Sequence, residues 1–516
     1  MSGALASEGQ RPRNSDVGPQ RIAIIGGGIS GLAVAYELQR LQSESPSAFV
    51  LFEATHRLGG IVETVKRDGF VIECGPDAWV TEKPWARELA IELGLESEIL
   101  PSNDAQRRTL ILQKGELIPM PDGMRMMVPS DLAAIDTSSL FTDEARRAYR
   151  SEPVRADKLK SSAPPPSPEG DESIATFVRR HFGEEVTSKI AAPLLSGVFG
   201  GDIERLSVRS VMPAFVKMER EHGSLILALQ HRTAASATKD QLATKNQPTI
   251  FTTLASGLGT LIDAIAATLP PSAIRLLEPV NSIQIDEGNW EVTSAKGTQS
   301  FDEVVLATPA HITGQLLTPL DKRFGELLNI DASSAIVVAF AFRPEHASKL
   351  RIPQGFGFLA PQTPNASSAQ ASIDGTTVNE PSTLEPSLLA CTFVDQKFRH
   401  RVPTDAKLLR AFYGGDAALA LLTETDESLI VRARRQLAAI LKIPEPAFNP
   451  AFTLVRRWPK SLPQYEVGHE ARVSEIENLA ATIPGLHLAG NTWHGVGLPD
   501  LIRDGRATAR KTVDPK

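Results

Sequence analysis

The sequence predicts an α/β fold, α+β over the whole chain, with a parallel sheet assembled from pieces that lie far apart in the sequence. The β-branched run 21–25, the helical pattern 29–41 and the apolar run 49–52 form one β-α-β unit. The apolar runs 301–308 and 486–490 are also typical of buried parallel strands. Because long segments separate these strands, we expect other domains to be inserted between them.

The composition is that of an ordinary soluble protein with several domains. Of the 516 residues, 42% are hydrophobic and 22% charged, so we expect about two to four domain-like units. The net charge of -7, without a basic block, argues against nucleic acid as a partner. Cys74 and Cys391, which are the only cysteines, are far apart. This spacing favours reduced thiols in a cytoplasmic protein over a disulfide or a metal site.

The sharpest motif directly follows the first strand. It is a G-x-G-x-x-G pattern made of Gly26, Gly27, Gly28, Ile29, Ser30 and Gly31. In this pattern the first glycine makes a tight turn, the second lets the backbone approach a pyrophosphate, and the third lets helix and strand pack closely. Glu53 ends the next strand, where an acid holds ribose hydroxyls. Together these features predict a Rossmann-type dinucleotide site.

Two further motifs favour FAD over NAD as the dinucleotide. The first consists of Arg57, Gly59, Gly60, Gly75, Pro76 and Asp77. It resembles the second signature of flavin oxidases, in which an Arg and paired glycines lie along the cofactor. Near the C-terminal end, residues 488–491 resemble the closing flavin motif, in which a strand turns into a helix. We therefore expect non-covalently bound FAD.

Further blocks make the resemblance specific. Besides the flavin motifs, they are residues 192–202, 206–207, 458–469 and 490–500. The chain resembles the oxygen-dependent protoporphyrinogen and coproporphyrinogen oxidases, FAD-dependent relatives of the monoamine oxidases. Blocks 192–202 and 458–469 are not shared with amine oxidases in general. The resemblance implies a Rossmann-type FAD-binding domain, an inserted substrate domain with a mixed sheet, and a helical subdomain.

The same resemblance implies a set of residues around FAD. Besides the glycine motif and Glu53, it places there Arg57, Gly59, Gly60, Gly75, Pro76, Asp77, Ala78, Val280, Asn491, Val496, Gly497 and Leu498. Asp77 can equally be a loop acid, and Asp500 a helix-cap acid. No catalytic acid or base is assigned, because oxidation of a porphyrinogen gives an aromatic product and demands no strong protein base.

The family binds its tetrapyrrole between apolar and aromatic side chains. Leu359 and Phe393 stand at the matching positions, and the resemblance implies that Gly197 presents its backbone to the pyrrole nitrogens. Without the resemblance, a Leu or Phe at strand spacing indicates core. Many relatives carry a propionate-binding Arg where this chain has Thr109. Arg108 either replaces that Arg or is a solvated surface residue.

The patterns also divide the chain into parts. We expect a disordered tail over 1–20, an FAD-binding domain over 21–100, 250–310 and 475–516, a substrate-binding domain over 101–118, 222–249 and 311–474, and a helical subdomain over 119–221. Residues 151–172 are polar and rich in Pro, which predicts a mobile insertion too polar to pack. The polar stretch 361–387 predicts a long surface loop. Residues 120–127 indicate either a core helix or an apolar surface that contacts a membrane.

The function that follows is oxidation of a porphyrinogen to a porphyrin, with O2 as acceptor and H2O2 as product. Protoporphyrinogen IX and coproporphyrinogen III both remain open as substrates. A flavin amine oxidase, a carotenoid desaturase and a catalytically silent FAD-binding scaffold are the alternatives. We expect a cytoplasmic protein without a membrane span, because no run of eighteen apolar residues occurs. A homodimer and peripheral contact with the inner face of the cell membrane stay open.

Overall fold

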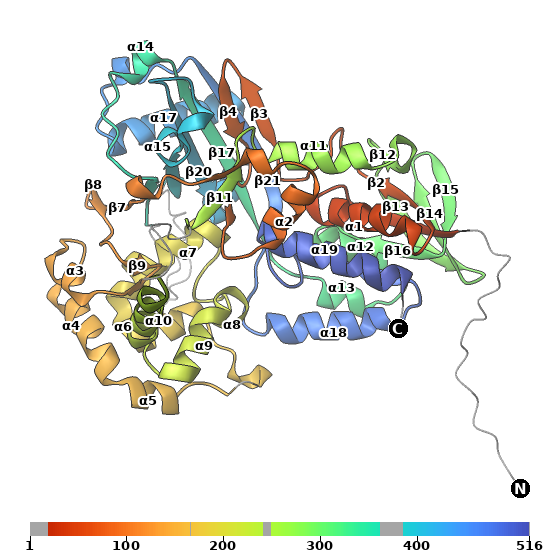
Figure 1. Cartoon of the computed structure of the whole chain (residues 1–516), viewed down its shortest axis with the longest axis horizontal. Coiled ribbons are helices and arrows are strands. Elements are labelled where there is room, and N and C mark those ends of the chain that lie inside the picture. Colours follow the sequence, from red (N-terminus) through yellow and green to blue (C-terminus); the bar gives the residue numbers. More distant parts are fainter. Residues whose placement is uncertain (1–18, 166, 241–248, 362–384, 515–516) are drawn as a thin grey trace, which may run out of the picture.

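The computed structural model describes residues 19–165, 167–240, 249–361 and 385–514. The described chain forms three parts, a nucleotide-binding part, a part built on a large mixed sheet, and a helical part below that sheet (Figure 1). The sequence-based expectations for the tail 1–20 and for most of the loop 361–387 lie outside the described residues.

A five-stranded parallel sheet forms the centre of the nucleotide-binding part. Its order is β12 (Ile274–Arg275), β2 (Ser47–Phe52), β1 (Gln20–Ile25), β16 (Glu303–Leu306) and β22 (Leu486–Leu488). All four strand pairs are parallel. The expected discontinuous parallel sheet is therefore confirmed, since its neighbours come from the two ends and the middle of the chain.

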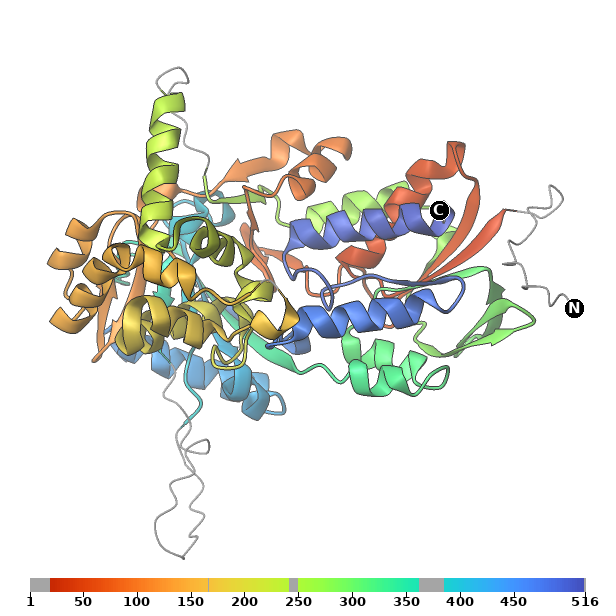
Figure 2. The same cartoon turned by 90° about the horizontal axis from the view of Figure 1, so that it is seen from below.

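Helices cover both faces of this sheet. They are α1 (Ile29–Arg40), α2 (Trp85–Glu92), α11 (Gly259–Thr268), α12 (Ala310–Leu317), α13 (Arg323–Leu327), α18 (His469–Ala481) and α19 (Leu498–Val513). Helix α1 is buried over nearly its whole length and packs beside α19, so the first and last helices share one core (Figures 1 and 2). The buried apolar side chains Leu32, Leu38 and Ile502 lie in that core.

Three small sheets and hairpins surround the parallel sheet. They are the antiparallel β13 (Val280–Asp286), β14 (Asn289–Ser294) and β15 (Gly297–Phe301), the hairpin β3 (Thr64–Arg67) and β4 (Phe70–Glu73), and the sheet β5 (Trp79–Val80), β11 (Phe251–Leu254) and β6 (Ile99–Pro101). The last of these joins the nucleotide-binding part to the mixed sheet, because β6 leads into β7.

The mixed sheet has seven strands. Its order is β21 (Phe452–Pro463), β17 (Ala332–Phe342), β20 (Lys407–Gly414), β19 (Ala390–Phe393), β18 (Gly357–Leu359), β7 (Thr109–Gln113) and β8 (Glu116–Pro119). Only the β18–β7 pair is parallel. One face is covered by α16 (Gly415–Leu421) and α17 (Asp426–Ile440), which pack on Phe340, Phe358 and Tyr413. The short helices α14 (Pro344–Ala347) and α15 (Val394–Lys397) follow β17 and β19.

The helical part has its own core. It contains α3 (Leu132–Thr137), α4 (Asp143–Val154), α5 (Ala156–Ser161), α6 (Ile174–Val186), α7 (Ala192–Phe199), α8 (Val208–Val211), α9 (Pro213–His222) and α10 (Leu225–Asp240). Helix α10 projects from this part (Figure 2). Leu225 and Leu229 at its start pack in the helical core. The division that placed 222–249 with the substrate-binding domain is therefore wrong for the beginning of α10.

The prediction that residues 151–172 are too polar to pack is wrong. They continue α4 and form α5 and a 3-10 turn, Pro168–Gly170. Leu159 is buried, and Glu152 is fully buried because its carboxylate accepts hydrogen bonds from the Leu225 amide and from His181. Hydrogen bonds within the helical core thus satisfy the polar groups whose presence motivated the prediction.

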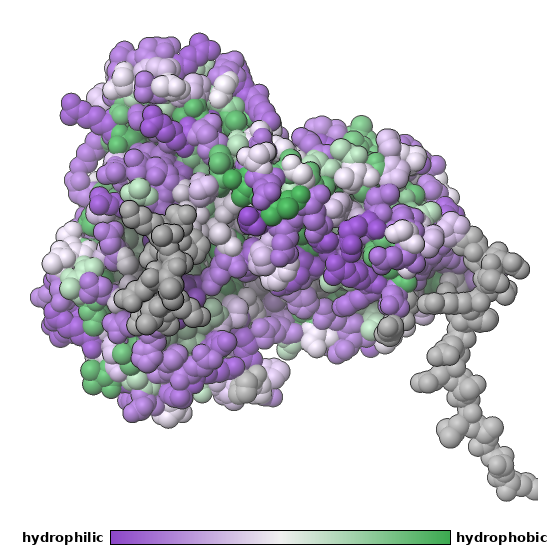
Figure 3. Space-filling model, viewed as in Figure 1, coloured by the Kyte–Doolittle hydropathy of each residue, from purple (hydrophilic) through white to green (hydrophobic). Residues whose placement is uncertain are grey.

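Residues 120–127 form no helix. They lead into the two-stranded hairpin β9 (Met124–Arg125) and β10 (Val128–Pro129). Met127 is fully buried, and Met120, Met124 and Met126 pack partly buried against the helical core. The core interpretation of this stretch is thus correct, although its secondary structure is not. The visible face of the molecule is mostly hydrophilic, with hydrophobic residues in small groups (Figure 3).

Candidate active site

A cavity of about 710 Å3 lies at the carboxyl ends of strands β1, β2 and β16. Open parallel sheets bind nucleotides at this edge, where the helical crossovers leave a crevice. The cavity is lined by residues within 25–30, 52–61, 278–281, 307–316, 458–461 and 490–491, and by Leu501. The parallel sheet thus forms most of the wall, and the mixed sheet contributes the end of β21.

The glycine turn has the geometry that a dinucleotide requires. A side chain at Gly26 would place its Cβ 2.6 Å from the Ala307 carbonyl oxygen, and one at Gly31 would meet the Gly26 oxygen at 1.9 Å. At Gly28, by contrast, a Cβ would meet nothing within 4 Å. Gly28 is also the N-cap of α1, which has no side-chain cap. The first-turn amides and the open space at Gly28 therefore fit a pyrophosphate.

Glu53 is fixed at the rim of this turn. Its Oε2 accepts a hydrogen bond of 2.8 Å from the Gly27 amide, and its Oε1 accepts one of 2.8 Å from the Thr55 amide. Both bonds come from backbone, so the carboxylate has one defined position in the cavity wall. A carboxylate in this position fits the ribose hydroxyls of an adenosine half.

Arg57 donates hydrogen bonds to the loop that crosses the glycine turn. Its Nη1 donates to the Leu58 and Val62 carbonyls at 3.1 and 3.2 Å, and its Nη2 donates to the Gly60 carbonyl. The Gly59 amide in turn donates to the Gly27 carbonyl at 2.8 Å. Arg57, Gly59 and Gly60 therefore line the cavity as one hydrogen-bonded loop, and the guanidinium orders that loop.

Gly75, Pro76, Asp77 and Ala78 are not among the described residues that line the cavity. Asp77 instead pairs with Lys397 at 2.8 Å and with Arg410 at 3.4 Å. Burial alone would raise the pKa of Asp77, but these two cations lower it to about 2. Arg410 also donates to the Gly75 carbonyl. The Asp77 carboxylate thus joins the nucleotide-binding part to strand β20 of the mixed sheet.

The C-terminal flavin motif is divided between the cavity wall and the helix behind it. Asn491 lines the cavity and donates from Nδ2 to the Ser461 carbonyl at 2.9 Å. Val496 and Gly497, which precede α19, and Leu498, its first residue, are not among the described lining residues. Asp500 in the first turn of α19 pairs with Lys83, whereas the N-cap of this helix is Gly497, without a side-chain cap. Val280 at the start of β13 lies in the wall, as expected.

The register of the mixed sheet separates Leu359 from Phe393. Leu359 is paired with Ala390, and Phe393 is three residues further along β19, so their side chains point to opposite faces. Phe393 is fully buried beside Phe358, with ring centroids 6.2 Å apart, in the core under α16 and α17. The prediction that Phe393 and Leu359 enclose a substrate together is wrong, because the Phe393 side chain packs in the core of the mixed-sheet part.

Leu359 and Gly197 do come together. A Cβ at Gly197 would lie 2.9 Å from Leu359 Cδ2, so the exposed backbone of α7 meets this side chain directly. Arg108 is exposed at the beginning of β7, and its carbonyl accepts the Phe356 amide at 2.8 Å. Gly197 and Leu359 are thus in contact, and Arg108 is accessible, while their roles toward a substrate stay predictions.

Sequence reasoning missed several side chains of the site. Thr392 and Phe412 are partly exposed and, by strand alternation, lie on the same sheet face as Leu359. Trp458 and Lys460 line the cavity, and Trp458 Nε1 donates to the Cys74 carbonyl at 2.7 Å. The sequence of β20 does not alternate between apolar and polar residues, so no pattern in it singles out Phe412. No sequence signal could have indicated Lys460, which lies in a left-handed conformation (φ 46°).

Neither cysteine can reach the cavity. Cys74 and Cys391 are buried, and neither is among the described lining residues. Burial raises the pKa of the Cys74 thiol to about 12 and also raises that of Cys391. Thiols of this kind are poor nucleophiles, which agrees with a cofactor held without a cysteinyl bond.

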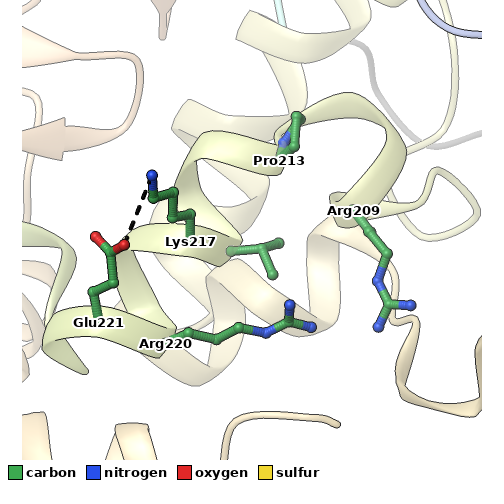
Figure 4. A pocket seen from close by; sticks show the side chains of 6 residues that line it. Arg209, Pro213, Lys217, Arg220 and Glu221 are labelled. Atoms are coloured by element: carbon green, nitrogen blue, oxygen red, sulfur yellow. Dashed lines mark ion pairs between the residues drawn. The ribbon is translucent and has the colours of Figure 1, made fainter. Parts of the chain in front are cut away.

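A second pocket, of about 380 Å3, lies on α8 and α9, away from this cavity (Figure 4). Its side chains are Arg209, Lys217, Arg220 and Glu221 around Pro213 and Val216. Lys217 pairs with Glu221 at 3.7 Å, and the Arg209 guanidinium donates to the Ser167 carbonyl at 2.9 Å. None of its residues belongs to a motif that the sequence predicts, and it is open to solvent.

The fold and the cavity define a flavin oxidoreductase, and the comparison with known sequences identifies its family. The family described as flavin containing amine oxidoreductase matches residues 29–512, so the chain belongs to it. That assignment confirms the expected FAD cofactor. The glycine turn fits the pyrophosphate of this cofactor and Glu53 fits its ribose, and the loop 57–60 lies against the glycine turn.

Within the family, the relatives that this chain resembles include porphyrinogen oxidases, as the resemblance implied. The chain is 33% identical to coproporphyrinogen III oxidase of Bacillus subtilis, over 95% of this chain and 97% of that protein. It is 30% identical to protoporphyrinogen oxidase of Bos taurus, over 95% and 98%. A crystal structure from Exiguobacterium sp. 255-15, provisionally named a protoporphyrinogen oxidase, superimposes with a TM-score of 0.80 at 29% identity, covering 96% of this chain and 99% of that one.

More distant structures share the fold alone. Putrescine oxidase with bound putrescine superimposes with a TM-score of 0.64 at 16% identity, over 96% of this chain. This likeness confirms the mixed α/β architecture and carries no argument about substrate. Within the described part of the chain, no helix is long and apolar enough to cross a membrane.

Proposed function

We propose that this protein oxidises a porphyrinogen to the corresponding porphyrin, with FAD as cofactor and O2 as the final acceptor. The observation that carries the proposal is the likeness to coproporphyrinogen III oxidase, which extends over 95% of the chain and therefore includes the cavity and the Gly197–Leu359 contact. Bound FAD supplies two-electron oxidation, so three rounds with O2 convert the macrocycle and release three molecules of H2O2.

The residues on the substrate side bind and exclude water rather than move protons. Leu359, Thr392 and Phe412 form a largely apolar surface on one face of the mixed sheet, opposite the Gly197 backbone. Such a surface suits a flat, poorly soluble macrocycle. No side chain is assigned as a general base, because aromatisation drives the loss of the remaining pyrrole and meso protons.

Coproporphyrinogen III is the substrate that we expect to turn over faster. Relatives of that name from Bacillus subtilis, Staphylococcus aureus and Propionibacterium freudenreichii are 33%, 29% and 28% identical to this chain. Coproporphyrinogen also carries more propionates than protoporphyrinogen, and the exposed Arg108 directly precedes Thr109, the partner of Gly357 in the mixed sheet. Arg108 thus offers a cation for one of these groups.

The test is a parallel assay of the purified FAD-bound protein in air. Protoporphyrinogen IX and coproporphyrinogen III are supplied separately, and porphyrin fluorescence and H2O2 are followed against an enzyme-free control. We expect both rates to exceed autoxidation, with coproporphyrinogen III the faster. If neither rate exceeds the control while FAD is bound, the proposal is wrong, and the amines and polyenes of the alternative assignments become the substrates to screen.

The location and assembly of the protein remain proposals. We propose a cytoplasmic protein that can meet the inner face of the cell membrane, since its substrate class is poorly soluble, and a homodimer. Sedimentation with liposomes and light scattering of the purified protein test these two statements separately from the catalytic one.

A further inference from the structure

The segment between β21 and α18 contacts both the substrate-side helix α7 and the turn 491–495 of the flavin motif. It contains Gln464 and Tyr465 and leads into His469, the first residue of α18, and all three belong to a block that the family resemblance singled out without giving it a role. In Figure 1, α18 begins beside α8 of the helical part and then runs along the nucleotide-binding part, and Figure 2 agrees. The segment therefore crosses from one part to the other.

Tyr465 contacts the flavin motif. Its hydroxyl donates to the Asn491 carbonyl at 2.5 Å and accepts the Gly495 amide at 3.1 Å. Asn491 lines the cavity, and Gly495, which lies in a left-handed conformation (φ 141°), stands three residues before the start of α19. One buried hydroxyl thus fixes both ends of the turn that carries the cavity wall into α19.

Gln464 contacts the opposite side. Its Nε2 donates to the Phe199 carbonyl at 3.0 Å, at the end of α7 and two residues beyond Gly197. The backbone continues the connection, because the Tyr465 carbonyl accepts the Ser207 amide at 2.8 Å. Gln464 and Tyr465 are neighbours, so two adjacent side chains contact α7 on one side and the turn 491–495 on the other.

His469 holds the Tyr465 ring in place. The two rings are stacked, with centroids 4.0 Å apart and planes 14° apart. Burial lowers the pKa of His469 to about 4, and its Nε2 has no hydrogen-bond partner among the described atoms. At neutral pH the imidazole is therefore uncharged, and it acts as a flat apolar support for the tyrosine.

We propose that Gln464 and Tyr465 form a brace that couples the substrate-side helix α7 to the flavin turn 491–495, with Tyr465 as a positioning residue for the flavin. The coupling role of Gln464 rests on the proposed function, whereas the flavin-positioning role of Tyr465 does not. The geometry that supports both is the placement of two neighbouring side chains on opposite sides of the site.

The first test is Tyr465→Phe, which removes only the hydroxyl and keeps the ring stacked on His469. We expect the dissociation constant of FAD to rise about tenfold and the visible flavin spectrum to shift, because a buried donor and acceptor lose their partner. The control is Tyr149→Phe, since the buried Tyr149 hydroxyl donates to the Met127 carbonyl at 2.9 Å in the helical part. FAD affinity and spectrum should be unchanged in the control.

The second test is Gln464→Met, which keeps the side-chain length but removes the bond to Phe199. We expect weaker binding of coproporphyrin III, by several-fold in a fluorescence-quenching titration, with FAD affinity within about twofold of the parent. Parent-like FAD affinity and spectrum in Tyr465→Phe would overturn the flavin-positioning role. Parent-like porphyrin binding in Gln464→Met would overturn the coupling. An inactive parent that still loses FAD affinity in Tyr465→Phe would overturn only the proposed substrate.

Discussion

Gly28 and Gly31 belong to one motif but have different physical roles. A methyl group at Gly31 would overlap the Gly26 carbonyl oxygen at 1.9 Å, whereas one at Gly28 would meet no protein atom within 4 Å. Gly31 is therefore required for α1 to pack on β1. Gly28 is required by the ligand that occupies the cavity.

This difference predicts opposite behaviour of two alanine variants. Gly28→Ala should fold with the thermal stability of the parent apoprotein and bind FAD at least about tenfold more weakly, because its Cβ enters the space for the pyrophosphate. Gly31→Ala should lose stability in the apoprotein, by about 1–3 kcal/mol from overpacking. Thermal unfolding without FAD and FAD titration separate the two effects. Equal FAD affinity in Gly28→Ala and the parent would contradict the placement of the pyrophosphate.

At the scale of single residues, the sequence predicts those whose role follows from local geometry. The glycine turn and Glu53 lie as expected, because a β-α-β unit places them within a short stretch of chain. Asp77 and Phe393 were assigned by resemblance, and their contacts depend on distant strands. Asp77 pairs with Lys397, and Phe393 falls on the buried face of β19. Neither outcome is encoded nearby in the sequence.

Helices α1 and α19 are joined by a buried carboxylate. Glu37 is fully buried and pairs with Arg506 and Arg510 of α19, each at 2.8 Å, and with Arg40 at 2.7 Å. Burial alone would raise the pKa of Glu37, but these arginines lower it to about 2. The ion pairs of Glu37 with Arg506 and Arg510 therefore stabilise the packing of the first helix on the last one.

This arrangement predicts a pH-dependent stability. Since the folded pKa of Glu37 is below its ordinary value of 4.5, the stabilisation is fully present above about pH 5 and is lost as the pH falls towards 2. Glu37→Gln should lower the free energy of unfolding by about 2–3 kcal/mol at pH 7, less than for a fully dry pair because Arg510 is half exposed. The difference in the free energy of unfolding between Glu37→Gln and the parent should become smaller below pH 4.

Urea denaturation at pH 7 and pH 3 measures this effect. Glu345→Gln is the control, because Glu345 is an exposed helical acid. If the difference in the free energy of unfolding between Glu37→Gln and the parent stays constant from pH 7 to pH 3, ionised Glu37 is not the cause of the stabilisation.

Whole elements were predictable where a periodic pattern was long or strongly apolar. The helix 29–41 and the strand 49–52 agree with α1 and β2 to within a few residues. Helices α4 and α5 were missed, because Pro153 and the charges of the stretch favour a loop by local rules. They are stabilised by contacts outside the stretch, such as that of Arg155 with the His181 carbonyl at 2.7 Å.

At the scale of the whole molecule, segments that are far apart in the sequence all contribute residues to the cofactor site. The cavity wall takes residues from both ends of the chain and from the middle, and β21 of the mixed sheet adds Trp458. None of these segments can form the wall alone. A ligand that fills the cavity therefore binds the folded chain and not the unfolded one, and it stabilises all of the contributing segments together.

This linkage gives the last prediction. FAD at about 100 times its dissociation constant should raise the free energy of unfolding by about 2.7 kcal/mol, seen as a rise in the midpoint of thermal unfolding. FMN lacks the adenosine half, so it cannot use Glu53 or the wall around Val280, and its effect at equal concentration should be much smaller. The comparison is made by circular dichroism on the apoprotein. Equal shifts with FMN and FAD would mean that the glycine turn and Glu53 do not hold an adenosine diphosphate, and would require a different orientation of the flavin in the cavity.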